Sequence, residues 1–175
     1  MKSKWAIALL VVVLGAGVYG SVVLATPQSG VATSTLAKAT SGDINLSGHA
    51  VTTVVGKDGK PHPSVWVSWI KTLGTSDLYV VDNKFAAGAT TGWHTHPGPS
   101  VIFVVAGSIT NYMSNDPSCA PHVYSAGSSF TDPGGDVVHM LRNEGTTTAE
   151  TIAVQFIPTG AMRRIDESEP SNCHL

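Results

Sequence analysis

The chain has 175 residues, enough for one domain with a sizeable hydrophobic core. Only 13% of the residues are charged, while valine, threonine, serine and glycine are abundant, and this mixture favours strands and turns over helices. The formal net charge of −2 leaves no basic surplus, which argues against a nucleic-acid partner.

Residues 1–25 have the features of a targeting segment. Two lysines precede an uncharged run from Trp5 to Ala25. Val23 and Ala25 occupy positions −3 and −1 of a possible cleavage point before Thr26, as in a signal peptide. The run is also long enough to cross a bilayer, so a retained membrane anchor is the alternative. Both interpretations place the domain outside the cytoplasm, secreted or periplasmic, with membrane contact only through this segment if it is uncleaved.

Residues 26–43 are rich in serine, threonine, alanine and glycine, and we interpret them as a linker. Over residues 44–175, short strand-forming runs alternate with turn residues, which predicts an all-β antiparallel sandwich or barrel. The expected strands are residues 49–55, 64–72, 77–85, 100–113, 122–127, 128–132, 137–143 and 150–158.

The expected strand at residues 64–72 is apolar on both faces. Val65, Val67 and Trp69 share one face, while Trp66 and Ile70 lie on the other. We therefore expect a second sheet or a partner chain, such as a second copy in a homodimer, to cover both sides.

Cys119 and Cys173 both lie in the part of the chain expected to be exported. An even number of cysteines in an oxidising compartment predicts a disulfide, which would fasten the C-terminal tail. The alternatives are a reactive thiol, or a metal ligand acting together with His174.

Two spaced motifs carry the strongest signal. The first half runs Gly88, five residues, His94, one residue, His96, three residues, Ser100, six residues, Gly107. A strand places His94 and His96 on the same face. The residues of the second half, in order, are Gly127, Pro133, Gly135, His139 and Asn143.

Together the two halves resemble the motifs of the cupin superfamily, G-x5-H-x-H-x3/4-E-x6-G and G-x5-P-x-G-x2-H-x3-N. The resemblance implies a jelly-roll β-barrel that binds a divalent metal through His94, His96 and His139. This sequence departs from the pattern twice. Ser100 stands where the acidic ligand is expected, and one extra residue separates Gly135 from His139.

The metal is one that accepts imidazole ligands, namely Fe, Zn, Cu, Ni or Mn, and Mn²⁺ should suffer most from a lost carboxylate. A metal-free pocket using the imidazoles as hydrogen-bonding groups is the alternative. Ser100 is either a vacated ligand position or a group that hydrogen-bonds a water on the metal. Among the other histidines, only His122 is a modest candidate for a further ligand. Asp132 and Asp136 flank a turn and are expected to be solvated.

Neighbouring strands offer weaker candidates for lining the pocket, which are Trp93, Phe103, Tyr112 and Gln155. In the cupin superfamily, three-histidine iron sites occur in thiol dioxygenases. The resemblance is therefore compatible with a dioxygenase-like oxidoreductase acting on a small molecule. A non-catalytic sensor or binder of a small molecule or sugar, and a structural barrel that has lost its metal, are the alternatives.

Overall fold

The computed structural model describes residues 25–175, so the predicted targeting segment lies almost entirely outside the described residues. Within that range the structure has no helix long and apolar enough to cross a membrane. Its regular elements are β1 (Ser29–Ser41), β2 (Asn45–Val55), β3 (Pro61–Lys71), β4 (Ser76–Thr90), β5 (His94–Thr95), β6 (Ser100–Ala106), β7 (Ser108–Met113), β8 (His122–Ser125), β9 (Ser129–Asp132), β10 (His139–Arg142), β11 (Ala149–Pro158) and β12 (Ile165–Asp166).

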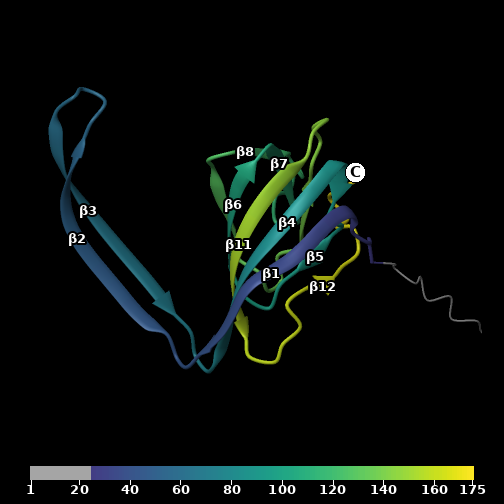
Figure 1. The fold of residues 1–175 in the computed structure, drawn as a ribbon, viewed down its shortest axis with the longest axis horizontal. Helices are drawn as coiled ribbons and strands as arrows, with labels where there is room; N and C mark the ends of the chain where they lie inside the picture. The colour runs from purple at the N-terminus through teal and green to yellow at the C-terminus, as the bar shows by residue number, and fades with distance from the viewer. Residues whose placement is uncertain (1–24) are drawn as a thin grey trace, which may run out of the picture.

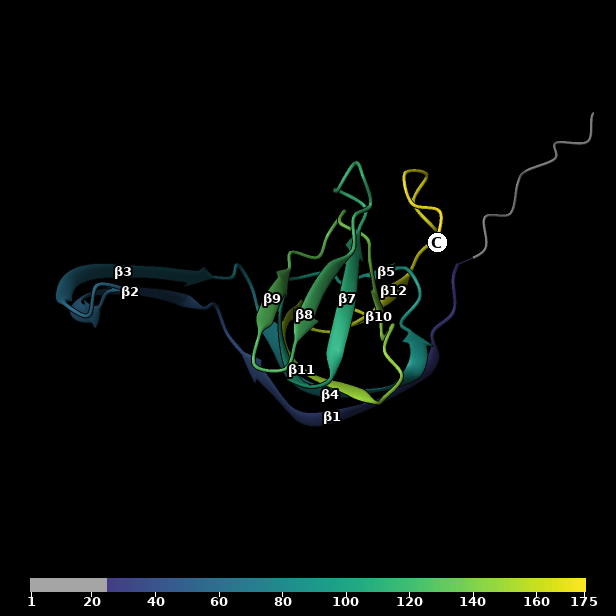
Figure 2. The ribbon, with the colours of Figure 1, turned by 90° about the horizontal axis from the view of Figure 1, so that it is seen from above.

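Ten strands curl into a nearly closed antiparallel barrel (Figures 1 and 2). Their order is β12-β5-β10-β4-β11-β6-β9, with β1 added to β4 and β7 joining β10 to β8. The predicted all-β jelly-roll barrel is therefore confirmed.

The interpretation of residues 26–43 as a linker is wrong for most of its length. Residues 29–41 form β1, which pairs with β4 along its whole length. Small polar residues suggested a flexible segment, but Val31, Thr33 and Thr35 alternate as a strand requires. Thr33 Oγ1 also donates a hydrogen bond of 2.8 Å to Asn83 Oδ1 on β4. This segment is part of the barrel wall.

The main core fills the barrel from the inward faces of β4, β6 and β11. Along β11 every second residue is buried, which is the signature of a strand with one face on a core. The largest apolar members of the core include Val81, Phe85, Ile102, Val104 and Ile109. This packed end leaves the opposite end of the barrel to polar side chains.

A second buried cluster lies beside the first and contains the predicted disulfide. Cys119 and Cys173 are bonded, and they pack with Trp93, Tyr112 and Met140. The bridge fastens the C-terminal tail to the loop after β7. Such a bond is typical of proteins from oxidising compartments.

Strands β2 and β3 form a separate two-stranded ribbon that projects from the barrel (Figures 1 and 2). We call residues 45–71 the arm. The expected second sheet over this segment is absent from the described residues: Trp69 is 81% exposed and Trp66 58%. Both faces of the arm are open.

Candidate metal centre

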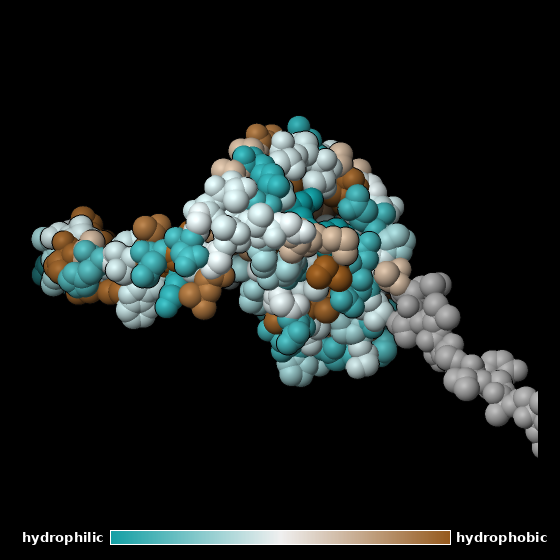
Figure 3. Space-filling model, turned by 90° about the horizontal axis from the view of Figure 1, so that it is seen from below, coloured by the Kyte–Doolittle hydropathy of each residue, from teal (hydrophilic) through white to brown (hydrophobic). Residues whose placement is uncertain are grey.

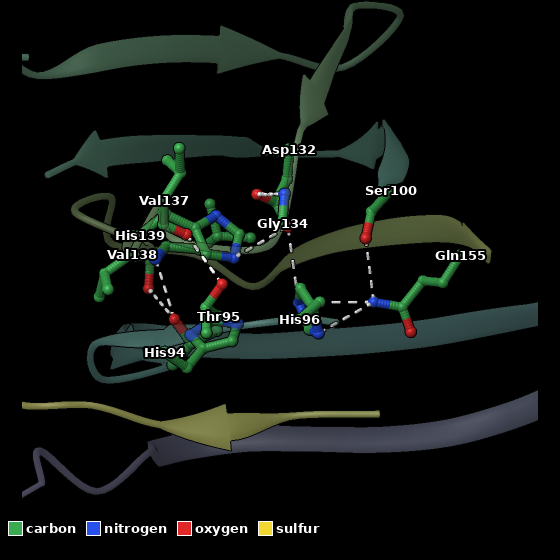
Figure 4. A network of polar contacts seen from close by, with 12 residues as sticks. His94, Thr95, His96, Ser100, Asp132, Gly134, Val137, Val138, His139 and Gln155 are labelled. Carbon is green, nitrogen blue, oxygen red and sulfur yellow. Dashed lines mark hydrogen bonds and ion pairs between the residues drawn. The ribbon is translucent and has the colours of Figure 1, made fainter. Parts of the chain in front are cut away.

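The three motif histidines meet because two short strands pair at one end of the barrel. His139 on β10 stands opposite His94 on β5 in the antiparallel register. His96 follows two residues after His94, so its ring turns to the same side. Figure 4 shows the three rings converging from these strands.

The rings form a compact buried group, which we call the histidine cluster. The centroid of the His94 ring lies 4.4 Å from that of His139 and 5.0 Å from that of His96. One nitrogen from each ring lies within 4.8 Å of the others, and all three side chains are buried. Three imidazoles at this spacing can hold a metal ion.

Backbone carbonyls fix the orientation of two of the rings. Nδ1 of His94 lies 3.0 Å from the carbonyl oxygen of Gly92, and Nδ1 of His96 lies 2.6 Å from that of Arg163. With Nδ1–H donating to a carbonyl, Nε2 keeps the lone pair that a metal requires. Oxygen acceptors behind ligating histidines are the usual supporting arrangement in metal sites.

Burial keeps the histidines neutral. Desolvation lowers the pKa of His139 to about 4, with a further contribution from the positive charge of Arg164. Desolvation likewise lowers the pKa of His96 to about 4. The pKa of His94 is well below its ordinary value, chiefly because of burial. The cluster thus offers uncharged ligands at neutral pH, as metal binding requires.

The turn between Pro133 and Gly135 seats β10 against His96. Gly134 has φ +68°, and a Cβ there would lie 2.6 Å from the carbonyl oxygen of His96. Gly135 N–H donates a 2.7 Å hydrogen bond to the same carbonyl. Only glycine fits this approach of the two backbones, so the extra residue before His139 is absorbed in a fixed turn.

Ser100 is buried beside the cluster. Its hydroxyl accepts a 3.1 Å hydrogen bond from Gln155 Nε2, and that amide nitrogen lies 3.4 Å from both ring nitrogens of His96 (Figure 4). Arg163 in turn donates a 2.9 Å hydrogen bond to Gln155 Oε1. Ser100 and Gln155 therefore belong to the polar wall of the site.

Asp132 is the largest departure from the sequence-based expectation. It is fully buried, whereas we expected a solvated turn residue. Its Oδ2 lies 3.6 Å from His139 Nε2 and 3.8 Å from His96 Nε2. Desolvation raises the pKa of this carboxyl. Asp136 in the same turn is exposed, as expected.

Three of the four weaker candidates for the pocket lie elsewhere. Trp93 is buried in the second cluster, because it alternates with His94 and faces the other way. Tyr112 packs in that same cluster and donates a 2.7 Å hydrogen bond to Glu144. Phe103 is 44% exposed on the outer face of β6. Only Gln155 lines the cavity beside the histidines.

His122 is exposed and does not contact the histidine cluster. Its side chain is 47% exposed, and its Nε2 lies 3.2 Å from Asp116 Oδ2. In the part of the chain that the structure describes, it is not among the residues grouped with His94. The interpretation of His122 as a further ligand is therefore wrong.

Two arginines of the cavity were missed from the sequence. Arg163 and Arg164 follow β11 and line the same small cavity, of about 60 Å³, as the histidine cluster. Arg164 is anchored by a 2.6 Å hydrogen bond to the carbonyl oxygen of Thr91. The pair RR in a turn carries no spacing signal, because its position depends on how the C-terminal segment returns to β5. Arg164 also pairs with Asp166 at 2.6 Å, whereas Arg163 has no acidic partner among the described residues, so Arg163 brings positive charge to the cavity.

Residues 83–155 match the Cupin domain family, and this stretch contains the histidine cluster, Ser100 and Asp132. This stretch of the barrel is therefore similar to cupin domains. No curated protein sequence matches the chain.

Solved structures resemble the barrel at low identity. One is an oxalate oxidase in complex with the substrate analogue glycolate, 22% identical with a TM-score of 0.44, covering 51% of this chain and 45% of that one. Another is a Klebsiella pneumoniae protein with a double-stranded β-helix domain, 20% identical with a TM-score of 0.44, covering 53% and 76%. A third is a cupin superfamily protein from Desulfitobacterium hafniense, 12% identical with a TM-score of 0.40, covering 46% and 67%. The chain spans under half the length of the oxalate oxidase chain.

Proposed function

We propose that the protein works outside the cytoplasm as a metal-dependent cupin that binds a small anionic molecule beside its ion. The observation that carries the proposal is the shared cavity. Three neutral imidazoles that can hold a divalent ion and two arginines line the same small space. The disulfide and the character of residues 1–25 support a location outside the cytoplasm.

The residues present fit a metal. His94, His96 and His139 would hold it, and neither ring nitrogen of His139 has a hydrogen-bond partner among the described residues. A bound divalent ion supplies Lewis acidity and, if it is iron or copper, a redox centre suited to dioxygenase-like oxidation.

The side chains that line the cavity determine which ligands can bind beside the metal. The guanidinium groups of Arg163 and Arg164 favour a carboxylate or another small anion. Gln155, hydrogen-bonded to both Arg163 and Ser100, fixes one wall of the cavity. The limited volume excludes bulky ligands such as polysaccharides. A small carboxylic acid is the ligand class that this wall selects.

The test begins with metal content. Protein purified without chelators should carry about one divalent ion per chain, and the His94→Ala/His96→Ala variant should carry almost none. Elemental analysis gives both values. Equal metal in the two proteins would refute a metal centre at this position.

Function is then separated from simple binding. Oxygen uptake is measured across a panel of small carboxylates, thiols, phenols and diketones, with titration calorimetry on the same panel. Uptake that depends on metal identifies an oxidase or dioxygenase. Binding of a carboxylate without uptake identifies a sensor or binder. If no anion in the panel is bound or supports oxygen uptake, the proposed ligand class is wrong.

A further inference from the structure

Only one oxygen of the buried Asp132 carboxyl group takes part in the hydrogen bonding of the described residues. Its Oδ1 accepts a 3.0 Å hydrogen bond from Gly134 N–H. Its Oδ2 has no hydrogen-bond partner among the described residues, although the side chain is fully buried. A buried carboxylate oxygen without a partner is costly unless a positive charge compensates it.

The free oxygen faces the histidine cluster. The distances from Oδ2 to Nε2 of His139 and of His96 are similar, 3.6 and 3.8 Å, and both are too long for hydrogen bonds. A divalent cation between these atoms would take Oδ2 and a His139 ring nitrogen as ligands, and both groups lack hydrogen-bond partners in the described range.

The ladder between β6 and β9 explains how a carboxylate reaches this place. Asp132 on β9 stands directly opposite Ser100 on β6. Cross-strand partners have Cβ atoms about 5 Å apart and point to the same face. A carboxylate at position 132 can therefore reach the same space as an acidic side chain at position 100.

We infer that Asp132 is the fourth, carboxylate ligand of the metal centre, transferred from the usual strand to its neighbour. This inference rests on the proposed metal site and deepens it. The ligand set would become three imidazoles and Oδ2 of Asp132, while Oδ1 accepts the Gly134 N–H. Such a set accepts Mn²⁺ and Fe²⁺ more readily than three imidazoles alone.

Asp132→Asn tests the role with little disturbance, since the amide oxygen still accepts the Gly134 N–H. Equilibrium dialysis should show Mn²⁺ affinity falling about 10- to 100-fold, with a smaller loss for Zn²⁺. Asp136→Asn is the matched control in the same turn and should bind as wild type. Adding Ser100→Glu to Asp132→Asn should recover most of the Mn²⁺ affinity, because the carboxylate returns across the ladder.

The outcomes are distinct. Wild-type protein that binds no divalent ion refutes the metal centre itself. Wild-type binding with an unchanged Asp132→Asn variant refutes only the fourth ligand. Thermal melting of the metal-free variants shows that each is folded. Should Asp132→Asn fail to fold, Mn²⁺ binding by the double variant decides: recovered affinity supports the carboxylate role, and absent affinity overturns it.

A different observation concerns the arm, residues 45–71. It holds nine of the sixteen large hydrophobic side chains that are exposed in the described residues. Val51, Val65, Val67 and Trp69 share one face through the β2–β3 register, and Trp66 lies on the other. In Figure 3, hydrophobic side chains are spread along the whole arm. An isolated two-stranded ribbon is at best marginally stable in water, so this one needs a cover.

The arm does not lie on its own barrel. At its base Thr72 N–H donates to the carbonyl oxygen of Ile44 at 2.8 Å, and Gly74 N–H donates to Asp43 Oδ1 at 2.8 Å. These bonds join the two segments that enter and leave the arm at its base, and they support the projecting course seen in Figure 2. Apart from residues at its base, the arm is left uncovered by the described residues of its own chain.

The barrel of the same chain offers a matching surface. On β6 the outward residues Val101, Phe103 and Val105 are apolar, and they adjoin Ile152 and Val154 on β11. A groove of about 480 Å³ continues this surface into the angle at the base of the arm. Its apolar lining comprises Trp69, Ile70, Leu73, Pro97, Pro99, Val101, Phe156 and Pro158.

The charged residues of the arm favour a protein partner over a membrane. The tip of the arm carries Lys57, Asp58 and Lys60, next to the exposed Val54 and Val55. Inserting the ribbon tip-first into lipid would bury these charges. Lying across a sheet would leave them at the rim, in water.

We propose that the arm docks on the outer face of β6 and β11 of a second copy. A two-fold dimer needs one chain to carry both complementary surfaces, and this chain carries both. It buries one face of each arm, and on the face that carries Trp69 that side chain alone can bury roughly 150–250 Å². An interface of about 800 Å² per partner is within reach of that arrangement. Each strand, at 11 residues, is about 36 Å long and comparable to β11.

Light scattering after size exclusion tests the dimer. The wild-type protein should be dimeric at micromolar concentration, and Trp69→Ser/Val67→Ser should be monomeric. Phe103→Asp on the receiving surface should dissociate it equally. Met162→Ser, at an exposed apolar position away from the arm, should stay dimeric. All four proteins should keep the same metal content.

A monomeric wild-type protein, or dimers that persist in both variants, would overturn the proposal. Sedimentation with phosphatidylcholine vesicles is the second measurement. A monomer that sediments with vesicles, and loses this on Trp69→Ser/Val67→Ser, would assign the arm to a lipid surface instead.

Discussion

The His139→Leu variant should lose divalent-metal binding by more than about 100-fold while keeping, or slightly gaining, stability in the metal-free state. A leucine fills a similar volume but offers no ligand. It also removes two buried nitrogens that have no hydrogen-bond partner among the described residues. Leaving a buried polar group unpaired costs about 1–3 kcal/mol, so its removal should not weaken the metal-free fold.

His122→Leu is the matched control for this experiment. His122 is exposed and lies against Asp116, outside the histidine cluster. Its metal affinity should equal that of the wild type. Equilibrium dialysis gives the affinities, and thermal denaturation in chelator gives the stabilities. A His139→Leu protein that keeps its metal would remove this residue from the site. A loss of several kcal/mol without metal would show that the imidazole serves mainly in packing.

The positions of the three histidines could be predicted because the signal is local. A period of two places His94 and His96 on one face, and a glycine-rich turn introduces the strand that carries His139. The resemblance to a known pair of motifs joined the two halves. Each of these clues lies within a few residues of the side chain it locates.

The acidic and basic groups of the site are positioned by pairing between distant strands. Asp132 follows a strand and precedes Pro133, so composition indicates a solvated turn residue. It is buried only because β9 pairs with β6 in a register that sets it opposite Ser100. Arg163 and Arg164 enter the cavity because the chain after β11 returns to β5. Such long-range register leaves no local mark in the sequence.

The outer parts of the fold were harder to predict for a related reason. Residues 29–41 have the composition of a linker, yet a long partner strand, β4, supplies the hydrogen bonds that make them a strand. The arm was predicted correctly as strands and as apolar on both faces. Its projection from the barrel was not predicted, because a strand with two apolar faces does not indicate which surface it will meet.

Breaking the disulfide should have the largest effect on stability. The bond between Cys119 and Cys173 closes a loop with a sequence separation of 54 residues. The chain-entropy relation gives about 4 kcal/mol for a loop of this length, and that is a large share of the stability of an ordinary domain. Cys173 is buried against Trp93 and Met140, so the freed tail would also expose part of the second core cluster.

Urea unfolding of Cys119→Ala/Cys173→Ala against wild type measures this cost, both with chelator present to exclude metal stabilisation. Ser171→Ala, in the same tail, is the control and should change little, because its side chain is exposed. The histidine cluster comes from β5, the residue that follows it and β10 rather than from the tail. Metal affinity at a temperature where the variant is folded should therefore stay within a few-fold of wild type. A loss below about 1 kcal/mol would show that packing alone holds the tail. A large loss of metal affinity would show that the second cluster also positions β5.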